Sequence, residues 1–388
     1  MRAGVETLPN SALPSPEVGV VRNGTALGPR TIIALLGRHD YPTDGVEDYC
    51  RLLREALAAW GRDLDVVRMF WLERGWLKSL YCLWRKSKGK KGCWVLLQYT
   101  ALGWSRRGLP LLVIFVLWVV RARRMRIAVI FHDPELYGGR RLVDRVRRYC
   151  QCFVMRYIYW FADKSVLTVP LGNVSWLSSN PSKARFIPVG ANIPAASSGR
   201  SPRKRHGSQT IAIFGVTGDG SVGDEVSDIA FAVKEVAKQV PDLRLVTLGR
   251  GSKKSEPKFR DALEGSAVEY SALGILPPEK VSQVLADSDV ALFVRGPIST
   301  QKGTAIASIA CGLPVVAYSD SRLPTPLAEV GVVGVPCGDR QALAEATIRI
   351  LADRQLWFEL HQRSQTHFEK YFSWETIATH FIELLDHA

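Results

Sequence analysis

The sequence of 388 residues lacks the patterns by which cysteine usually supports a fold. Its seven cysteines form no Cys-x-x-Cys pair and show no cysteine–histidine spacing of a zinc site. Cys150 and Cys152 lie two positions apart without a partner cluster. We therefore expect reduced thiols, no metal site and a cytoplasmic protein.

Long apolar runs are also missing. Residues 1–30 are rich in proline, glycine and serine and contain no apolar segment of the kind that a secretory signal needs, so we expect a mobile tail. The run Leu109–Val120 is shorter than the roughly 20 residues that cross a bilayer, and we interpret its core as a buried helix. The segment Trp71–Lys91 mixes aromatic and basic residues and is the better candidate for contact with lipid.

Acidic residues are scarce in the first half of the chain. Residues 1–195 contain 30 Lys and Arg against 14 Asp and Glu, a net charge of +16, whereas the remaining 193 residues carry −2. A basic face suits nucleic acid, anionic lipid or an acidic substrate. Because no segment resembles a nucleic-acid-binding module, we expect no nucleic-acid partner. Our hypothesis is that the protein is peripheral on the inner face of the membrane and contacts an anionic membrane surface through its basic N-terminal domain.

Apolar strands alternate with helical patterns along the whole chain. The expected strands are Thr31–Leu36, Asp63–Met69, Trp94–Tyr99, Ile127–Phe131 and Ser165–Val169 in the first half, and Thr210–Phe214, Leu243–Leu248, Val268–Tyr270, Val290–Val294 and Val315–Tyr318 in the second. Helices are expected between them, among others at Val46–Trp60, Val226–Gln239 and Pro278–Ala286. This alternation predicts an α/β protein with two doubly wound, Rossmann-like domains.

Composition divides the chain into four parts. We expect the tail at residues 1–30, an N-terminal domain at 31–194, a linker at 195–209 and a C-terminal domain at 210–388. The linker is rich in proline, serine, glycine and charge. Whether the last helix packs back on the N-terminal domain stays open. Two doubly wound domains create a cleft between their strand ends, which is the expected ligand site.

The most informative segment is Ser299–Tyr318, in which a polar loop leads into a short helix and a buried strand. Its loop gathers small, hydroxyl and basic residues at a strand end and a helix start: Ser299, Thr300, Lys302, Gly303 and Thr304. Such a loop suits a phosphate-bearing substrate. The alternative is a tight turn that merely packs well.

A second glycine-rich loop offers a competing interpretation. Gly218, Gly220 and Gly223 form a GxGxxG pattern after the strand Thr210–Phe214, and Arg250 after the next strand would suit a 2′-phosphate. Together they would indicate an NADP-dependent oxidoreductase. We do not favour this, because a lone GxGxxG is a weak signal and the loop is long and polar.

Four segments carry a resemblance to the retaining glycosyltransferases of family 4, which have the GT-B fold. They are DGVEDYCRLLREALAAWG (Asp44–Gly61), FHDPELYG (Phe131–Gly138), ARFIPVGANIP (Ala184–Pro194), and Ser299–Tyr318 together with the preceding LGILPPEKVSQVLADSDVALF (Leu273–Phe293). In their order and spacing they span nearly the whole chain from residue 31. The resemblance implies two domains that face across a cleft.

The resemblance also implies an activity. It is the transfer of a sugar from a nucleotide-sugar donor to a glycan or lipid-linked acceptor, with retention and without a metal or other cofactor, in cell-surface polysaccharide biosynthesis. The implied donor-binding residues are Gly45, Val46, Arg250, Ser299, Thr300, Lys302, Gly303 and Thr304. The implied catalytic residue is His132, with Tyr99, Thr100 and Asp133 on the acceptor side.

Structural alternatives stand beside these roles. Gly45 could serve only the turn into a helix, and Arg250 could be a solvated loop cation. His132 could be a structural histidine whose hydrogen bonds are made within the fold. Tyr99 and Thr100 could pack at the rim of the cleft.

One departure from the family matters. Many members carry two glutamates eight positions apart, which bind hydroxyls of the donor sugar, and here Ser299 and Ala307 stand at those positions. This leaves open a non-catalytic homologue that binds a glycan or a partner transferase. A nucleotide-sugar epimerase would also need acidic residues at these positions. Their absence therefore does not favour an epimerase over a glycosyltransferase.

Overall fold

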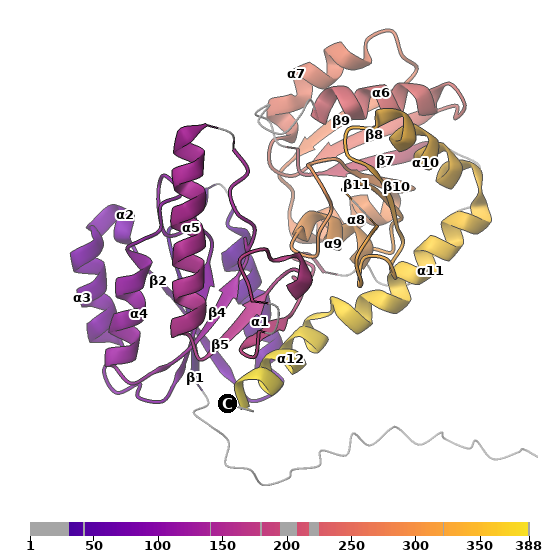
Figure 1. Cartoon of the computed structure of the whole chain (residues 1–388). Coiled ribbons are helices and arrows are strands. Elements are labelled where there is room, and N and C mark those ends of the chain that lie inside the picture. The colour runs from indigo at the N-terminus through magenta and orange to yellow at the C-terminus, as the bar shows by residue number, and fades with distance from the viewer. Residues whose placement is uncertain are drawn as a thin grey trace, which may run out of the picture.

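The computed structural model describes residues 31–41, 43–139, 141–178, 181–194, 208–216, 225–320 and 322–386. The expected tail, nearly all of the expected linker and the three glycines of the GxGxxG pattern lie outside the described residues. Two six-stranded parallel sheets with interleaved helices form two α/β domains, which Figure 1 shows side by side. The predicted doubly wound, two-domain fold is confirmed.

The N-terminal domain is built on a sheet with the strand order β2-β1-β3-β4-β5-β6. Its elements are β1 (Thr31–Leu36), α1 (Gly45–Ala58), β2 (Asp63–Arg68), α2 (Trp71–Arg74), α3 (Trp76–Lys86), β3 (Trp94–Tyr99), α4 (Val113–Ala122), β4 (Arg126–Phe131), α5 (Leu142–Phe161), β5 (Lys164–Leu167), the 3-10 helix η1 (Leu171–Asn173) and β6 (Ala184–Phe186). Helices α3, α4 and α5 cover one face of this sheet, and α1 covers the other. Burial on both faces explains why the central strands are continuous apolar runs.

The C-terminal domain repeats the plan with the strand order β12-β11-β10-β7-β8-β9. Its elements are β7 (Gln209–Phe214), α6 (Glu225–Ala237), β8 (Leu243–Leu248), α7 (Ser252–Leu263), β9 (Glu269–Gly274), α8 (Pro278–Asp287), β10 (Val290–Phe293), α9 (Gly303–Ala310), β11 (Val315–Ser319), β12 (Val332–Pro336), α10 (Arg340–Ala352), α11 (Arg354–Tyr371) and α12 (Trp374–Asp386). Helices α6, α7 and α10 pack on one face of the sheet, and α8 and α9 pack on the other.

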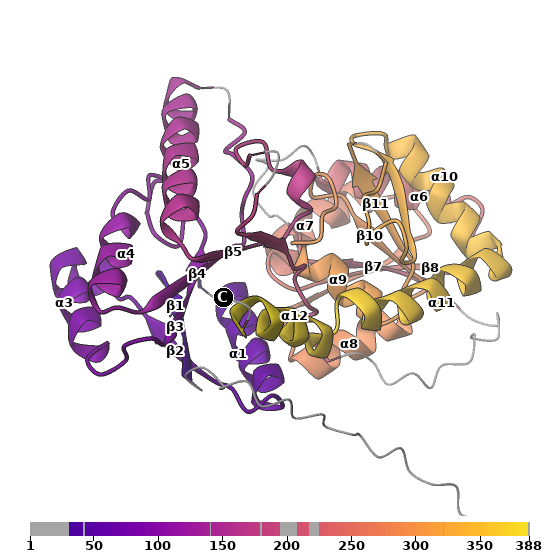
Figure 2. The same ribbon diagram turned by 60° about the horizontal axis from the view of Figure 1, so that its bottom comes forward.

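The last helix leaves its own domain. Figures 1 and 2 show α11 and α12, in yellow, running from the C-terminal domain back to the N-terminal one. Ile377, Phe381 and Leu385 of α12 join the core formed by α1 and the first sheet. At the start of α12, the indole Nε1 of Trp374 donates a hydrogen bond of 2.7 Å to the carbonyl oxygen of Ala191. The N-terminal domain is therefore completed by the end of the chain.

Most expected strands lie within a few residues of their predicted bounds, but β6 and β12 were not predicted. β6 has three half-exposed residues at a sheet edge, and β12 is interrupted by Gly334, so neither contains a long apolar run. The expected buried helix in Leu109–Val120 is α4, which begins at Val113. Its interpretation as buried is correct for one side only, because Phe115 and Trp118 are exposed. Among the described residues, no helix has both the length and the apolar content to cross a bilayer.

Candidate functional site

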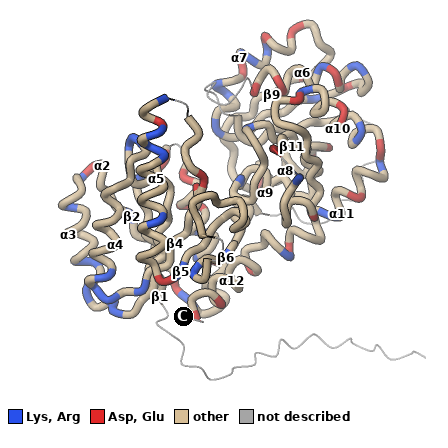
Figure 3. The backbone as a smooth tube through the Cα atoms, viewed as in Figure 1, with Lys and Arg blue, Asp and Glu red and all other residues tan. Residues whose placement is uncertain are grey.

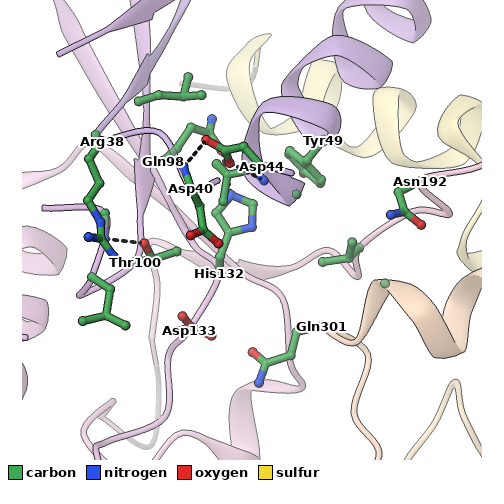
Figure 4. Close-up of a pocket in the computed structure, with 18 of the residues that line it drawn as sticks. Arg38, Asp40, Asp44, Tyr49, Gln98, Thr100, His132, Asp133, Asn192 and Gln301 are labelled. Carbon is green, nitrogen blue, oxygen red and sulfur yellow. Dashed lines mark hydrogen bonds between the residues drawn. The ribbon is translucent and has the colours of Figure 1, made fainter. Parts of the chain in front are cut away.

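A cavity of about 370 Å³ lies between the two domains, at the carboxyl ends of the strands of the first sheet (Figure 4). The residues that line it include Gly45, Val46, Gln98, Thr100, His132 and Asp133 of the N-terminal domain, Gln301 and Gly303 of the C-terminal domain, and Trp374 of α12. Both domains thus contribute to one cleft, as expected for paired Rossmann-like domains.

The start of α1 forms the floor of the cleft on the N-terminal side. Asp44 is the N-cap of α1, and its Oδ1 accepts hydrogen bonds from the backbone N–H groups of Val46 and Glu47 at 3.1 and 3.2 Å. Arg68, at the end of β2, holds this cap through a contact of 3.0 Å to Asp44 Oδ2. No atom of the described residues lies within 4 Å of the place where a Cβ of Gly45 would stand, so a ligand can approach the backbone there.

Three potential metal ligands meet beside this cap. Ligand atoms of His39, Asp44 and Glu47 lie within 4.8 Å of one another. Arg68 already contacts both carboxylates, at 3.0 Å for Asp44 and 2.8 Å for Glu47. A divalent cation would be repelled by that guanidinium, so the donor set does not suit a metal as it stands.

His132 follows β4 and is held by its neighbour on β3. Its Nε2 lies 2.7 Å from Oε1 of Gln98, while Nε2 of Gln98 donates to the carbonyl oxygen of Leu96 at 3.3 Å. Because the amide presents its oxygen to the ring, the imidazole carries its proton on Nε2 and keeps a lone pair on Nδ1. The edge of the Tyr49 ring packs against the imidazole, with centroids 5.0 Å apart.

The cleft shifts the protonation of two adjacent residues. Burial lowers the pKa of His132 from 6.5 to about 4, against the smaller opposite effect of the Asp44 carboxylate. His132 is therefore neutral near pH 7. The surrounding protein raises the pKa of Asp133, although its side chain can still be reached by solvent, and the positive charge of Lys302 opposes this rise. Lys302 thus acts across the cleft on a residue of the other domain.

The start of α9 faces the cleft from the C-terminal domain. Gly303 is its first residue and lines the cavity, with open space where a Cβ would stand. The helix N-terminus points N–H groups and a partial positive charge toward the cavity. Lys302 precedes it as the N-cap residue.

Arg295, which follows β10, lies behind this helix start. Its guanidinium donates to Thr304 Oγ1 at 3.0 Å and lies close to Gly215, the residue after β7. Burial lowers the pKa of Arg295, against the opposite effect of the Glu225 carboxylate. Nε of Arg295 is buried and has no hydrogen-bond partner among the described residues. An anion bound at the carboxyl edge of the second sheet would satisfy it.

Six of the twelve predicted site residues line the cavity: Gly45, Val46, Thr100, His132, Asp133 and Gly303. Ser299, Lys302 and Thr304 lie around the start of α9 without lining the cavity, and Ser299 Oγ is buried with no hydrogen-bond partner in the described part of the chain.

Two predicted site residues are corrected by the structure. Tyr99 is 0% exposed and packs against Phe131 on the α5 side of the sheet, because successive side chains of a strand alternate between its faces. Gln98 therefore faces the cleft in its place. Thr300 is also 0% exposed, and its hydroxyl donates to the carbonyl oxygen of Thr168 at 2.5 Å. Thr300 is thus a contact between the domains rather than a donor ligand.

Arg250 lies at the rim, outside the cavity lining. It forms an ion pair of 2.9 Å with Asp40 of the β1–α1 loop and also donates to the hydroxyl of Thr43 at 2.8 Å. Arg250 is therefore not a lining residue; it is an exposed cation that bridges the two domains.

The residues of the site that sequence reasoning missed include Asp44, Arg68, Gln98 and Arg295. Two of them left a usable signal. An aspartate immediately before a helical pattern marks an N-cap, and a polar Gln98 inside a buried apolar strand indicates a partner or a ligand. Arg68 and Arg295 left none, since their roles depend on which loops meet in space.

The comparisons with known proteins agree with a fold of two Rossmann-like domains. Residues 212–353 match the model of the family described as glycosyl transferases group 1. No curated protein matches the sequence. Among solved structures, Anabaena Alr3699/HepE in complex with UDP and glucose is similar at a TM-score of 0.66 and 13% identity, over 92% of this chain and 100% of that one.

Two further solved structures are similar over most of the chain. WaaG, a glycosyltransferase involved in lipopolysaccharide biosynthesis, has a TM-score of 0.56 and 13% identity, over 92% of this chain and 100% of that one. A Listeria monocytogenes protein named as a UDP-N-acetylglucosamine 2-epimerase has a TM-score of 0.59 and 10% identity, over 91% and 95%. The likenesses establish the fold, and the family match links residues 212–353 of the C-terminal domain to glycosyl transferases group 1. The predicted resemblance to GT-B glycosyltransferases is confirmed.

Proposed function

We propose that this chain, a glycosyltransferase of the GT-B fold, transfers a sugar from a nucleoside diphosphate donor to a glycan or lipid-linked acceptor. We further propose that the transfer occurs with retention, requires no metal ion and serves cell-surface polysaccharide biosynthesis. All seven cysteines are free thiols, which supports a cytoplasmic location.

The observation that carries the proposal is that both domains contribute to one cleft. The N-terminus of α9 and His132 come from different domains and line the same cavity. A donor whose diphosphate lies against α9 would place its sugar toward His132. The family match of residues 212–353, which include α9, supports donor binding on that side.

Cations and backbone amides replace the missing carboxylates in donor recognition. Ala307 is fully buried in the core of the C-terminal domain, so its position offers the donor no polar group. Among the described residues of this domain, Lys302, Arg295 and the N–H groups at Gly303 are available to a diphosphate. Their positive charge would stabilise the negative charge that develops on the leaving diphosphate, as transfer without a metal requires.

The chemical step forms one bond and breaks one. The oxygen of an acceptor hydroxyl bonds to the anomeric carbon, the bond from that carbon to the phosphate oxygen breaks, and the leaving diphosphate takes the hydroxyl proton. His132 is neutral and held by Gln98, so its role is to position a sugar hydroxyl by hydrogen bonding rather than to supply a charge.

Thermal denaturation with a panel of nucleoside diphosphates tests donor binding first. We expect one nucleotide to raise the melting temperature more than the others, because a ligand that binds the folded state stabilises it in proportion to its affinity. The corresponding nucleotide sugars are then assayed for transfer with and without a chelator. Activity lost on chelation and restored by a divalent cation would contradict metal independence, and the anomeric configuration of the product decides retention.

Two variants test the site itself. Lys302→Ala should weaken nucleotide binding, and His132→Ala should reduce transfer while leaving nucleotide binding intact. Lys258→Ala, an exposed lysine of α7, is the matched control for loss of charge. Nucleotide binding without any transfer in the unmodified protein would favour the non-catalytic homologue. Full transfer by both variants would refute this site.

A further inference from the structure

The exposed apolar side chains are concentrated on one part of the molecule. Of the 21 large hydrophobic residues that are exposed in the described part of the chain, 17 lie between Phe70 and Trp160. The C-terminal domain contributes only two among its described residues, Ile275 and Phe358. A large exposed apolar surface in a folded protein marks a site of interaction.

Helix α5 carries the longest row of these side chains. Leu142, Val146, Tyr149, Phe153 and Trp160 recur at helical spacing and are exposed, with 78% for Leu142, 76% for Tyr149 and 70% for Trp160. Its opposite side packs into the core through Val154, Met155 and Ile158. A helix of 20 residues is about 30 Å long, so the row extends over a distance typical of a small domain.

Helices α4 and α3 lie on the same face as α5 and add further exposed apolar side chains. Trp118 of α4 donates from its indole Nε1 to Tyr157 Oη of α5 at 2.8 Å, and Phe115 packs against Trp118. Figures 1 and 2 show α3, α4 and α5 on the same face of the sheet. We call this surface the α3–α5 face; its exposed side chains include Leu77, Tyr81 and Trp84 of α3, Phe115 and Trp118 of α4, and the row on α5.

The same segment holds the positive charge of the protein. Residues 70–160 contain 19 Lys and Arg against four Asp and Glu, a net charge of +15, compared with +14 for the whole chain. Helices α3, α4 and α5 contain one acidic residue, Asp144, and it is buried. Figure 3 shows the basic residues along α5 and where α3 and α4 end.

We propose that the α3–α5 face binds the surface of an anionic lipid bilayer. Aromatic and aliphatic side chains beside Lys and Arg suit the boundary between acyl chains and negatively charged headgroups. This extends the lipid contact expected at Trp71–Lys91 to α4, whose core was interpreted as a buried helix, and to α5.

Charge and chemistry decide against other occupants. A second copy of the chain would bring two strongly basic faces together, which like-charge repulsion opposes. Nucleic acid would match the charge but offers no apolar layer for Leu142, Val146 and Phe153. An anionic bilayer satisfies both properties of the face.

The location of α5 connects this surface to the cleft. Helix α5 begins at Leu142, at the end of the loop that starts with His132. Its first turn is therefore on the cleft side of the domain, and its last turn, which leads into β5, is at the opposite ends of the strands. A bilayer against α5 would lie beside the cleft entrance, within reach of a headgroup-linked acceptor. The surface itself does not depend on the proposed activity.

Cosedimentation of the full chain with lipid vesicles tests the proposal. We expect binding to vesicles of phosphatidylglycerol and phosphatidylcholine, weaker binding at high salt, and little binding to phosphatidylcholine alone. Tyr149→Ser, Phe153→Ser and Trp160→Ser combined should lower the partition coefficient at least about tenfold, because the apolar contribution is lost. Ile275→Ser with Phe358→Ser, on the C-terminal domain, is the matched control and should bind like the unmodified protein.

A second set of variants removes charge and keeps the apolar row. Lys78→Gln, Lys91→Gln and Arg145→Gln combined should lower binding to the anionic vesicles on the order of a hundredfold, at about 1 kcal/mol for each charge. Lys258→Gln, Lys280→Gln and Arg354→Gln in the C-terminal domain form the charge control.

Three results would overturn the proposal. The first is no binding to anionic vesicles at low salt by protein with unchanged thermal unfolding. The second is equal binding by the α5 serine variant and its control, which would indicate attraction to any polyanion. The third is a dimer in analytical ultracentrifugation that the α5 serine substitutions dissociate, because the face would then be an interface between copies. Since vesicle binding needs no donor, failure of the proposed transferase activity would not affect this test.

Discussion

The guanidinium of Arg250 and the carboxylate of Asp40 meet across the cleft at 2.9 Å, and they belong to different domains. The pair is more than one-third exposed on both sides. It therefore links the two cleft walls but adds little to the stability of the fold, because exposed ion pairs contribute little.

A double-mutant cycle on Arg250→Ala and Asp40→Ala measures this contact. We expect a coupling free energy of unfolding of about 0.2–1 kcal/mol, and a rise in KM for the donor that is the same in both single variants and the double variant. The pair Arg260–Glu256 lies within one domain at 2.7 Å and is the control. Additive effects on KM would show that Arg250 and Asp40 act separately.

The low pKa of His132 predicts a loss of stability in acid. The pKa is 6.5 in the unfolded chain and about 4 in the fold, so below pH 6.5 the unfolded state takes up a proton that the folded state does not. Between pH 7 and pH 5 this removes about 2 kcal/mol from the free energy of unfolding. His132→Asn should lack this component, as urea denaturation at the two pH values would show. The same loss in both proteins would mean that His132 titrates normally.

Thr300 and Thr304 predict opposite results for the same substitution. Thr300→Val removes the buried hydroxyl that bonds Thr168, so we expect a loss of about 1–2 kcal/mol in stability and unchanged nucleotide binding. Thr304→Val removes the hydroxyl that bonds Arg295, so nucleotide binding should weaken with a smaller loss of stability. Thermal unfolding and nucleotide titration of both variants provide the comparison. Weaker nucleotide binding in Thr300→Val alone would restore its predicted role as a donor ligand.

Arg295 is expected to bind the donor diphosphate. Arg295→Met should lower affinity for the nucleoside diphosphate roughly tenfold to a hundredfold, the range of one charge-assisted hydrogen bond. Arg295→Lys should recover part of this loss, because a lysine keeps the charge and lacks the planar fork. Arg340→Met removes an exposed arginine that stacks on Phe231 in the same domain and serves as the control. Equal affinities in the two methionine variants, measured by calorimetry, would exclude Arg295 from the donor site.

The fold was more predictable than the site, because each depends on different information. Strands buried on both faces are mostly apolar, so β1 and β3 were predicted to the residue, and β8 was too, although its Arg244 is exposed. Some cleft residues, such as His132 and Gly303, follow a strand or begin a helix. They were predicted because the local sequence also shows where strands end and helices begin.

The errors have a common physical cause. The sequence shows that Gln98, Tyr99 and Thr100 end a strand, but the face that each side chain occupies depends on how the sheet packs. Likewise Arg250 and Arg295 both follow a strand. Arg250 reaches the other domain, whereas Arg295 lies behind α9. These positions depend on contacts between segments far apart in the chain.

The crossing of α12 to the first domain has a consequence for how the protein is made. The core between α1 and the first sheet includes Ile377, Phe381 and Leu385, which leave the ribosome more than 300 residues after α1 begins. Until then, Leu53 and Leu57 on the same core surface lack their last neighbours. The first domain can therefore complete its core only after α12 has left the ribosome, and a truncation that removes α12 leaves this core without those three side chains.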